Sequence, residues 1–108
     1  MIAKNRRVMK PDGEGKVMTV RIEHTVQVWK ESDTYVARAV PLDVMSCGDS
    51  PDDARKNLSE AVALFLKTAA AHGTLVEVLE ESGYVREGDR WRSPKLLLSE
   101  TVTQSIHA

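Results

Sequence analysis

The stretch "CGDSPDDARKNLSEAVALFL", residues 47–66, contains the clearest local signal in the chain. Gly48 ends an apolar run. Ser50 and Pro51 follow it with the residue types preferred at the N-cap and the first position of a helix. Asp53 stands three residues after Ser50, so the two complete a capping box, and its charge suits the positive end of the helix dipole. The stretch therefore predicts a short strand that passes directly into a capped helix.

The helix that starts here has an apolar stripe at helical spacing. The stripe consists of Ala54, Leu58, Ala61, Val62, Phe65 and Ala69. A period near 3.6 residues predicts that this side of the helix lies on a sheet. Gly73, directly after His72, is a typical C-terminal stop.

Upstream of the helix, the sequence predicts three strands joined as an antiparallel meander. Residues 17–29 alternate between apolar and polar side chains, which indicates one long strand. Turn formers at 30–34 lead into a second strand at 35–40, and 42–47 form a short third strand. His24 falls on the apolar side of the alternation, where we expect a partly covered strand residue and no ligand.

Downstream of the helix, smaller elements follow. Residues 74–83 repeat the helix pattern with Thr74 as the cap, and 84–92 indicate a small hairpin. Residues 96–106, after Pro94, contain strand-forming residues and predict a strand at the edge of a sheet, in this chain or in a partner. The expected fold is α+β: a three-stranded antiparallel meander packed by one long helix, plus a short second helix and a C-terminal hairpin or strand.

The length of 108 residues fits a single domain. We predict a flexible basic arm over 1–16, an α+β domain over 17–93 and a C-terminal tail over 94–108. A single cysteine excludes an internal disulfide framework and favours a reducing compartment. Because no apolar run is long enough to span a membrane and no secretory signal is visible, we expect a cytoplasmic protein.

Charge is distributed unevenly along the chain. Residues 1–16 hold five basic and two acidic residues, whereas 17–83 hold six basic and eleven acidic ones. An acidic body is a poor match for a phosphate backbone and a good match for a basic protein. A solvated surface without a partner explains the same charges equally well.

A search for catalytic chemistry finds little. There is no glycine-rich phosphate loop and no paired Cys/His spacing typical of metal sites. Cys47, His24 and His72 offer a Cys–His pair only in principle, and a lone cysteine at a strand end is more often a packed hydrophobe. We therefore expect no cofactor and no enzymatic activity.

Four aspartates around the end of the third predicted strand leave a metal site as one alternative. They are Asp43, Asp49, Asp52 and Asp53. Grouped carboxylates hold Mg²⁺ in nucleases, and under this hypothesis Asp43 and Asp49 are ligands. Helix capping accounts for Asp52 and Asp53, and turn chemistry accounts for Asp49, without a metal.

Nucleic-acid binding is a second alternative. Trp91 stands between Arg90 and Arg92, an arrangement that suits base stacking. The basic arm would supply the phosphate contacts through Lys4, Arg6, Arg7 and Lys10. A tryptophan in a small hairpin is more often a lid over the core, so both interpretations stay open.

Taken in order, these elements resemble the HicB family of antitoxins. The similar segments are "YVARAVP" (35–41), "GDSPDDA" (48–54) and "RKNLSEAVALFL" (55–66), with a weaker likeness over 72–84. The resemblance implies a β-β-β-α-β core of degenerate RNase H-like fold without a working nuclease site. It also implies a partner, a small basic HicA-type toxin that cleaves mRNA, which the protein would bind and neutralise.

On this resemblance we expect the acidic helix and turn positions to contact the partner. These are Asp49, Asp52, Asp53 and Glu60. Residues 41–48 lack the Pro-Gly turn that is common in the family, and no DNA-binding domain is recognisable after residue 84, so repression of its own operon is not expected. A sheet of this size tends to pair or cover its edges, which predicts a homodimer or a higher homo-oligomer.

Overall fold

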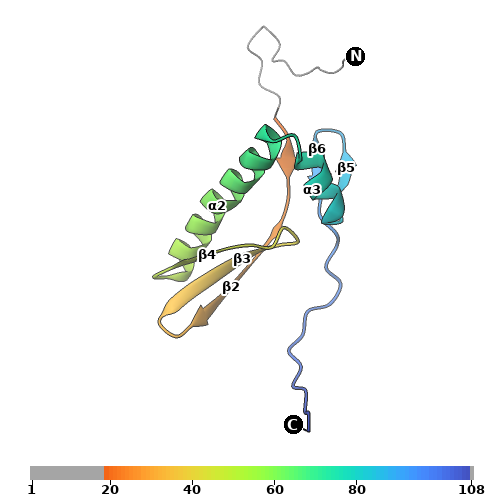
Figure 1. Cartoon of the computed structure of the whole chain (residues 1–108). Helices are drawn as coiled ribbons and strands as arrows, with labels where there is room; N and C mark the ends of the chain where they lie inside the picture. The colour runs from red at the N-terminus through yellow and green to blue at the C-terminus, as the bar shows by residue number, and fades with distance from the viewer. Residues whose placement is uncertain (1–18, 108) are drawn as a thin grey trace, which may run out of the picture.

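The structure is a computed structural model that describes residues 19–107. In chain order its elements are β1 (Arg21–Ile22), β2 (Thr25–Glu31), β3 (Thr34–Val40), β4 (Val44–Gly48), α2 (Pro51–Ala71), α3 (Leu75–Glu81), β5 (Val85–Glu87) and β6 (Arg90–Arg92). One sheet has the order β2-β3-β4 and the other β1-β6-β5. The predicted α+β class, with a long helix packed on a three-stranded antiparallel sheet, is confirmed (Figure 1).

The first sheet is the predicted meander, with β3 at its centre and β2 and β4 at its edges. β2 and β3 are joined by a two-residue turn in which Ser32 has a φ of 53°. Opposite residues of antiparallel strands share a face. The face toward α2, called here the inner face, carries Val26, Val28, Ala37, Ala39 and Val44, and the outer face carries Gln27, Trp29, Val36, Met45 and Cys47.

Helix α2 covers the inner face and begins as its sequence predicts. The hydroxyl oxygen of Ser50 accepts a hydrogen bond of 3.0 Å from the Asp53 backbone N–H, and Pro51 occupies the first turn. Four residues of the predicted stripe are buried, namely Ala54, Leu58, Val62 and Ala69. Phe65 keeps 36% of its surface exposed. The helix ends at Ala71 with His72 as its C-cap, before Gly73 with a φ of 74°.

The prediction of one strand over 17–29 is wrong in the described part of that range. β1 and β2 are separate strands in different sheets, because the chain changes partner at Glu23 and His24. The Glu23 N–H donates to the Trp91 carbonyl at 3.2 Å, and β1 runs parallel to β6. Alternation of side chains predicts an extended chain but carries no information about which strand lies beside it.

The second helix and the hairpin form as predicted, with one correction. α3 spans Leu75–Glu81, and β5 and β6 pair around Gly88, which has a φ of 65°. Thr74 does not cap α3 with its side chain. Its hydroxyl instead donates to the Ala69 carbonyl at 3.3 Å, because the short link between the helices sets Thr74 against the end of α2, where its backbone N–H donates to the same carbonyl at 2.9 Å.

A single core joins both sheets and both helices. Its buried members are Ala37, Ala39, Leu42, Ala54, Leu58, Val62, Leu79, Tyr84 and Trp91. Small alanines on β3 let α2 approach the sheet closely, and Leu58 and Leu79 are the largest fully buried side chains. Trp91 is 5% exposed, so the interpretation of this residue as a lid over the core is confirmed.

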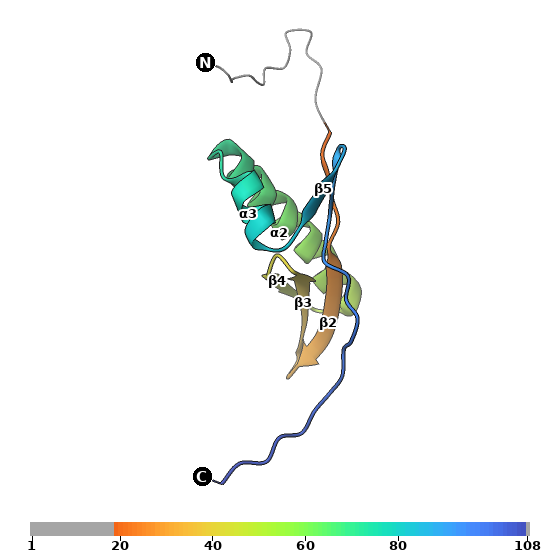
Figure 2. The same ribbon diagram turned by 90° about the vertical axis from the view of Figure 1, so that its right-hand side faces the viewer.

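Residues 93–107 contain no helix and no strand, so the edge strand predicted over 96–106 does not form within this chain. Figures 1 and 2 show this segment running away from both sheets. It lengthens the molecule to 59 × 31 × 24 Å and gives a radius of gyration of 17.9 Å, against about 13 Å for a compact domain of this size. The predicted basic arm, 1–16, lies outside the described residues.

Candidate interaction surface

The structure brings three of the four predicted partner-binding residues together. Asp49 follows β4 directly, and Asp52 and Asp53 lie in the first turn of α2; all three are exposed. Glu60 is also exposed but stands two turns further along the helix, about 10 Å from Asp53 along the axis. It therefore belongs to the side of α2 and not to the group at its start.

Two further carboxylates, which the sequence analysis missed, lie at the same end of the sheet. Tyr35 is opposite Gly48, so the end of β4 is level with the turn between β2 and β3. Glu31, the last residue of β2, and Asp33, in this turn, are both exposed. We call the five residues Glu31, Asp33, Asp49, Asp52 and Asp53 the acidic end (Figure 1, where α2 begins beside the β2–β3 turn).

The acidic end is not neutralised by ion pairs within residues 19–107. The two ion pairs of this region are Arg38–Asp43 and Arg92–Glu87, and neither includes one of its carboxylates. Lys30 lies nearby, with its ammonium group 5.5 Å from the centroid of the Tyr35 ring. Exposed carboxylates of one sign create a field that attracts a basic partner over a distance.

The fold does not bring together Asp43 and Asp49, the two ligands that the metal hypothesis requires. Asp43 precedes β4 and Asp49 follows it, so the five-residue strand between them holds them about 20 Å apart. The carboxylate of Asp43 is engaged by Arg38, 3.0 Å away. In the part of the chain described here, no group of three or more His, Cys, Asp or Glu side chains is arranged to hold a metal ion.

The Cys–His combination is dispersed as well. Cys47 is exposed on the outer face of the sheet, which corrects the prediction of a packed residue. His72 caps the far end of α2, and His24 lies on the other side of the sheet in a groove beside that helix. Neither His24 nor His72 is therefore placed to activate the Cys47 thiol.

The groove beside α2 has a volume of about 470 Å³ and is mainly apolar. It runs between the segment around β1 and one flank of the helix, and its walls include Val20, Ile22, Val62 and Leu66. The Nδ1 atom of His24 is buried there without a hydrogen-bond partner among residues 19–107. His24 is thus a partly covered residue, as predicted, although it lies between two strands and not within one.

Trp91 is not placed for base stacking. Its indole is buried in the core, and the guanidinium carbon of Arg86 lies 5.8 Å from the ring centroid. The four basic residues of the arm that would contact phosphates are outside the described region. The nucleic-acid hypothesis therefore loses Trp91, the residue that it requires for stacking on bases.

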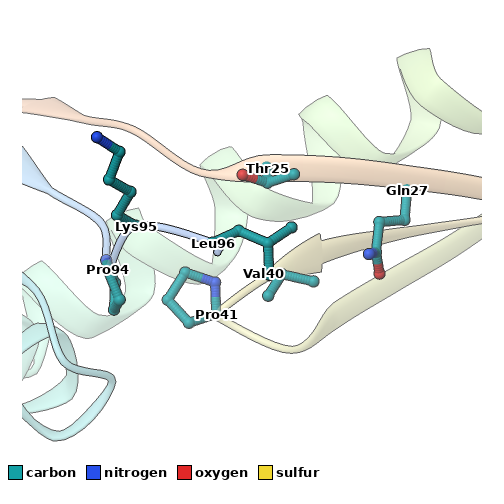
Figure 3. A pocket seen from close by; sticks show the side chains of 7 residues that line it. All are labelled: Thr25, Gln27, Val40, Pro41, Pro94, Lys95 and Leu96. Atoms are coloured by element: carbon teal, nitrogen blue, oxygen red, sulfur yellow. The ribbon is translucent and has the colours of Figure 1, made fainter. Parts of the chain in front are cut away.

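A second, smaller pocket of about 150 Å³ lies where the C-terminal segment leaves the body (Figure 3). Figure 3 shows Leu96 next to Val40 and Pro41, with Thr25 and Gln27 of β2 on the other side. This contact holds the start of the segment beside the edge strand β2.

Two groups at the junction between the two sheets, Tyr84 and Glu23, have shifted pKa values. Burial raises the pKa of Tyr84 to about 12, with a smaller contribution from the negative charge of Glu23. The pKa of Glu23 is lowered, because its carboxylate accepts hydrogen bonds of 3.0 Å from both the backbone N–H and the hydroxyl of Ser93. These groups connect structural elements and do not line either pocket.

Comparison with known proteins gives no match: no family model matches the sequence, and neither a curated protein nor a solved structure does. The resemblance to the HicB family therefore stays a prediction. None of the helices within residues 19–107 is long and apolar enough to cross a membrane.

Proposed function

We propose that the protein is an interaction protein of HicB-like antitoxin type, which binds and neutralises a small basic toxin. The observation that carries this proposal is the acidic end, where five exposed carboxylates from two segments of the chain, 31–33 and 49–53, lie at the end of the edge strand β4. A basic RNA-binding surface is complementary to such a field. Covering that surface would prevent the toxin from reaching RNA.

The order of elements supports the same proposal. Three antiparallel strands lead through Gly48 into a capped helix, as the resemblance implies. The site would work by occupancy alone, since covering another protein's RNA-binding surface needs no reacting group. Edge strand β4 offers backbone groups next to the carboxylates, so strand addition and charge pairing can act together.

The test is co-expression with a small basic protein encoded beside this chain. Suppression of that protein's toxicity and recovery of a complex are the expected results. Asp33→Asn, Asp49→Asn and Asp52→Asn, combined in one variant, should weaken the complex, and raised salt should weaken the unmodified complex in the same direction.

A matched control removes equal charge elsewhere. Glu77→Gln, Glu80→Gln and Glu81→Gln change three exposed carboxylates on α3, away from the acidic end. If this variant weakens the complex as much as the first one, net charge and not the acidic end is responsible. If the neighbouring protein is neither basic nor bound, the proposed function is wrong.

A further inference from the structure

The C-terminal arm, defined as residues 95–107, carries apolar side chains that its own chain leaves uncovered. They are Leu96, Leu97, Leu98, Val102 and Ile106, with exposed fractions between 61% and 86%. Only the start of the arm touches the body, at the pocket next to β2. Exposed apolar surface of this extent marks an interaction site.

The arm has the residue pattern of a strand with one mainly apolar face. Leu96, Leu98, Val102 and Ile106 share one parity with Glu100 and Gln104, whereas Ser99, Thr101, Thr103 and Ser105 share the other parity with Leu97. The period of two and the β-branched residues favour a strand. Glu100 is the only acidic residue after Pro94, and no lysine or arginine follows Lys95. The arm is therefore suited to pair through its backbone and apolar face, and less through charge.

Strand β2 offers a matching acceptor. It pairs with β3 on one side only, and its residues Thr25–Trp29 contain neither a charge nor a proline. Natural edge strands are usually protected by such residues. On the inner face of β2, Val26 and Val28 keep 36% and 38% of their surface exposed, because α2 lies mainly over β3 and β4.

The other edge of the sheet is less open. The side chain of Asn57 donates a hydrogen bond of 2.9 Å to the Cys47 carbonyl and so occupies one backbone group of β4. β4 also ends at the carboxylates of the acidic end, which an almost uncharged arm does not complement. β2 is the edge that fits the arm.

We propose that residues 96–106 of one chain add as a fourth strand to the edge of β2 in a second copy, and that the exchange is reciprocal. The apolar side of the arm faces the inner side of the sheet and covers Val26 and Val28. Eleven extended residues reach about 36 Å, whereas the seven residues of β2 need about 23 Å. The arm is long enough to pair with all of β2.

A second copy is the occupant because one chain contains both the donor and the acceptor. A two-fold dimer covers two apolar arms and two bare edges at once, without requiring any other protein. The same arm leaves its own body beside Thr25 and then diverges from β2, so only its start lies next to its own sheet (Figure 1). The proposal does not rest on the proposed function.

Light scattering after size exclusion, on the full chain alone, tests the dimer. We expect twice the chain mass for the unmodified protein and a shift to monomer for Val102→Asp. Thr103→Asp introduces the same charge on the polar side of the arm and should leave the dimer intact. Circular dichroism checks that each variant keeps its fold, and a monomeric unmodified chain overturns the proposal.

A second pair of variants tests the acceptor. Val28→Asp places a charge on the inner face of β2, whereas Gln27→Asp places it on the outer face. We expect the first to dissociate the dimer and the second to preserve it. If Gln27→Asp dissociates the dimer and Val28→Asp does not, the assigned face of β2 is wrong. If both variants remain dimeric, the choice of β2 as the acceptor strand is wrong.

Mixed samples distinguish exchange between chains from pairing within one. A spin label at Ser105→Cys, in a Cys47→Ser background, is mixed with an isotope-labelled Cys47→Ser chain that carries no spin label. Broadening of the amide signals of Thr25–Trp29 in the isotope-labelled chain is expected. Broadening over Val44–Gly48 instead, or only when both labels are on the same chain, contradicts the proposal. Since no toxin is present, either failure leaves the proposed function untouched.

Discussion

The hydroxyl of Tyr84 donates a hydrogen bond of 2.6 Å to the backbone carbonyl of Glu23, which lies 61 residues earlier in the chain. Glu23 stands at the point where the chain leaves the sheet of β1 and enters the sheet of β2. Its N–H is bound to Trp91 of the hairpin and its side chain to Ser93. This bond therefore ties the start of the meander to the segment that follows α3.

Tyr84→Phe should destabilise the fold by about 1 kcal/mol, because the Glu23 carbonyl loses a donor in a partly buried position while the ring still fills its place in the core. Urea unfolding followed by circular dichroism measures the difference. Tyr35→Phe is the matched control, since the Tyr35 hydroxyl makes no hydrogen bond within residues 19–107. Equal losses in both variants would show that the Tyr84 bond contributes nothing specific.

Stability should decline in alkali because of the same residue. The pKa of Tyr84 is raised by burial to about 12 in the fold, against roughly 10 in an unfolded chain. Its neutral form is the one that the fold favours, so its contribution is complete below pH 10 and is lost as the pH rises from 10 to 12. Urea unfolding across this range should show a steeper decline in the unmodified chain than in Tyr84→Phe. Identical slopes would contradict the assignment.

The decline of the unfolding free energy at acid pH should depend on Glu23. Hydrogen bonds from Ser93 lower the pKa of this carboxyl below its ordinary value of 4.5, so the ionised form is favoured in the fold. Its contribution is present above pH 4.5 and is lost as the pH falls through the lowered value.

Unfolding free energies measured between neutral and acid pH test this dependence. Glu23→Gln keeps an oxygen for Ser93 but cannot titrate, so it should flatten the acid decline. Ser93→Ala should have a partial effect, because the backbone donor remains while the hydroxyl is gone. An acid decline that is unchanged in Glu23→Gln would assign the titration to other carboxyl groups.

Local chemistry was sufficient to predict most of the elements. The capping residues around Ser50 and the turn formers after Trp29 fix where α2 and the β2–β3 hairpin begin, because these signals act within a few residues. The division between β1 and β2 was not predictable in this way. It depends on the pairing of Glu23 with Trp91, a contact across 68 positions that no local pattern contains.

The acidic end shows the same distinction. Asp49, Asp52 and Asp53 are neighbours in the sequence and were predicted together. Glu31 and Asp33 join them only through the register that sets Tyr35 opposite Gly48. The predicted meander already implied this proximity, since the first turn and the end of the third strand of a meander lie at the same end of the sheet.

Gly48→Ala should be strongly destabilising, because this glycine is where β4 touches the first turn of α2. A Cβ atom at Gly48 would lie 2.6 Å from the Ala54 nitrogen and 2.8 Å from the carbonyl carbon of Asp53. Backbone atoms of a capped helix cannot move aside as a side-chain tip can, so the strand and helix must separate. We expect a loss of about 1–3 kcal/mol, the range for overpacked sites.

Asp49→Ala is the control for this prediction. It changes the next residue, which is exposed, and should alter the unfolding free energy by no more than about 0.5 kcal/mol. Urea unfolding of both variants provides the comparison. A Gly48→Ala variant as stable as the unmodified chain would mean that β4 and α2 are further apart than described. The acidic end, which is assembled by this contact, would then lose the support that holds Asp49 beside Asp52.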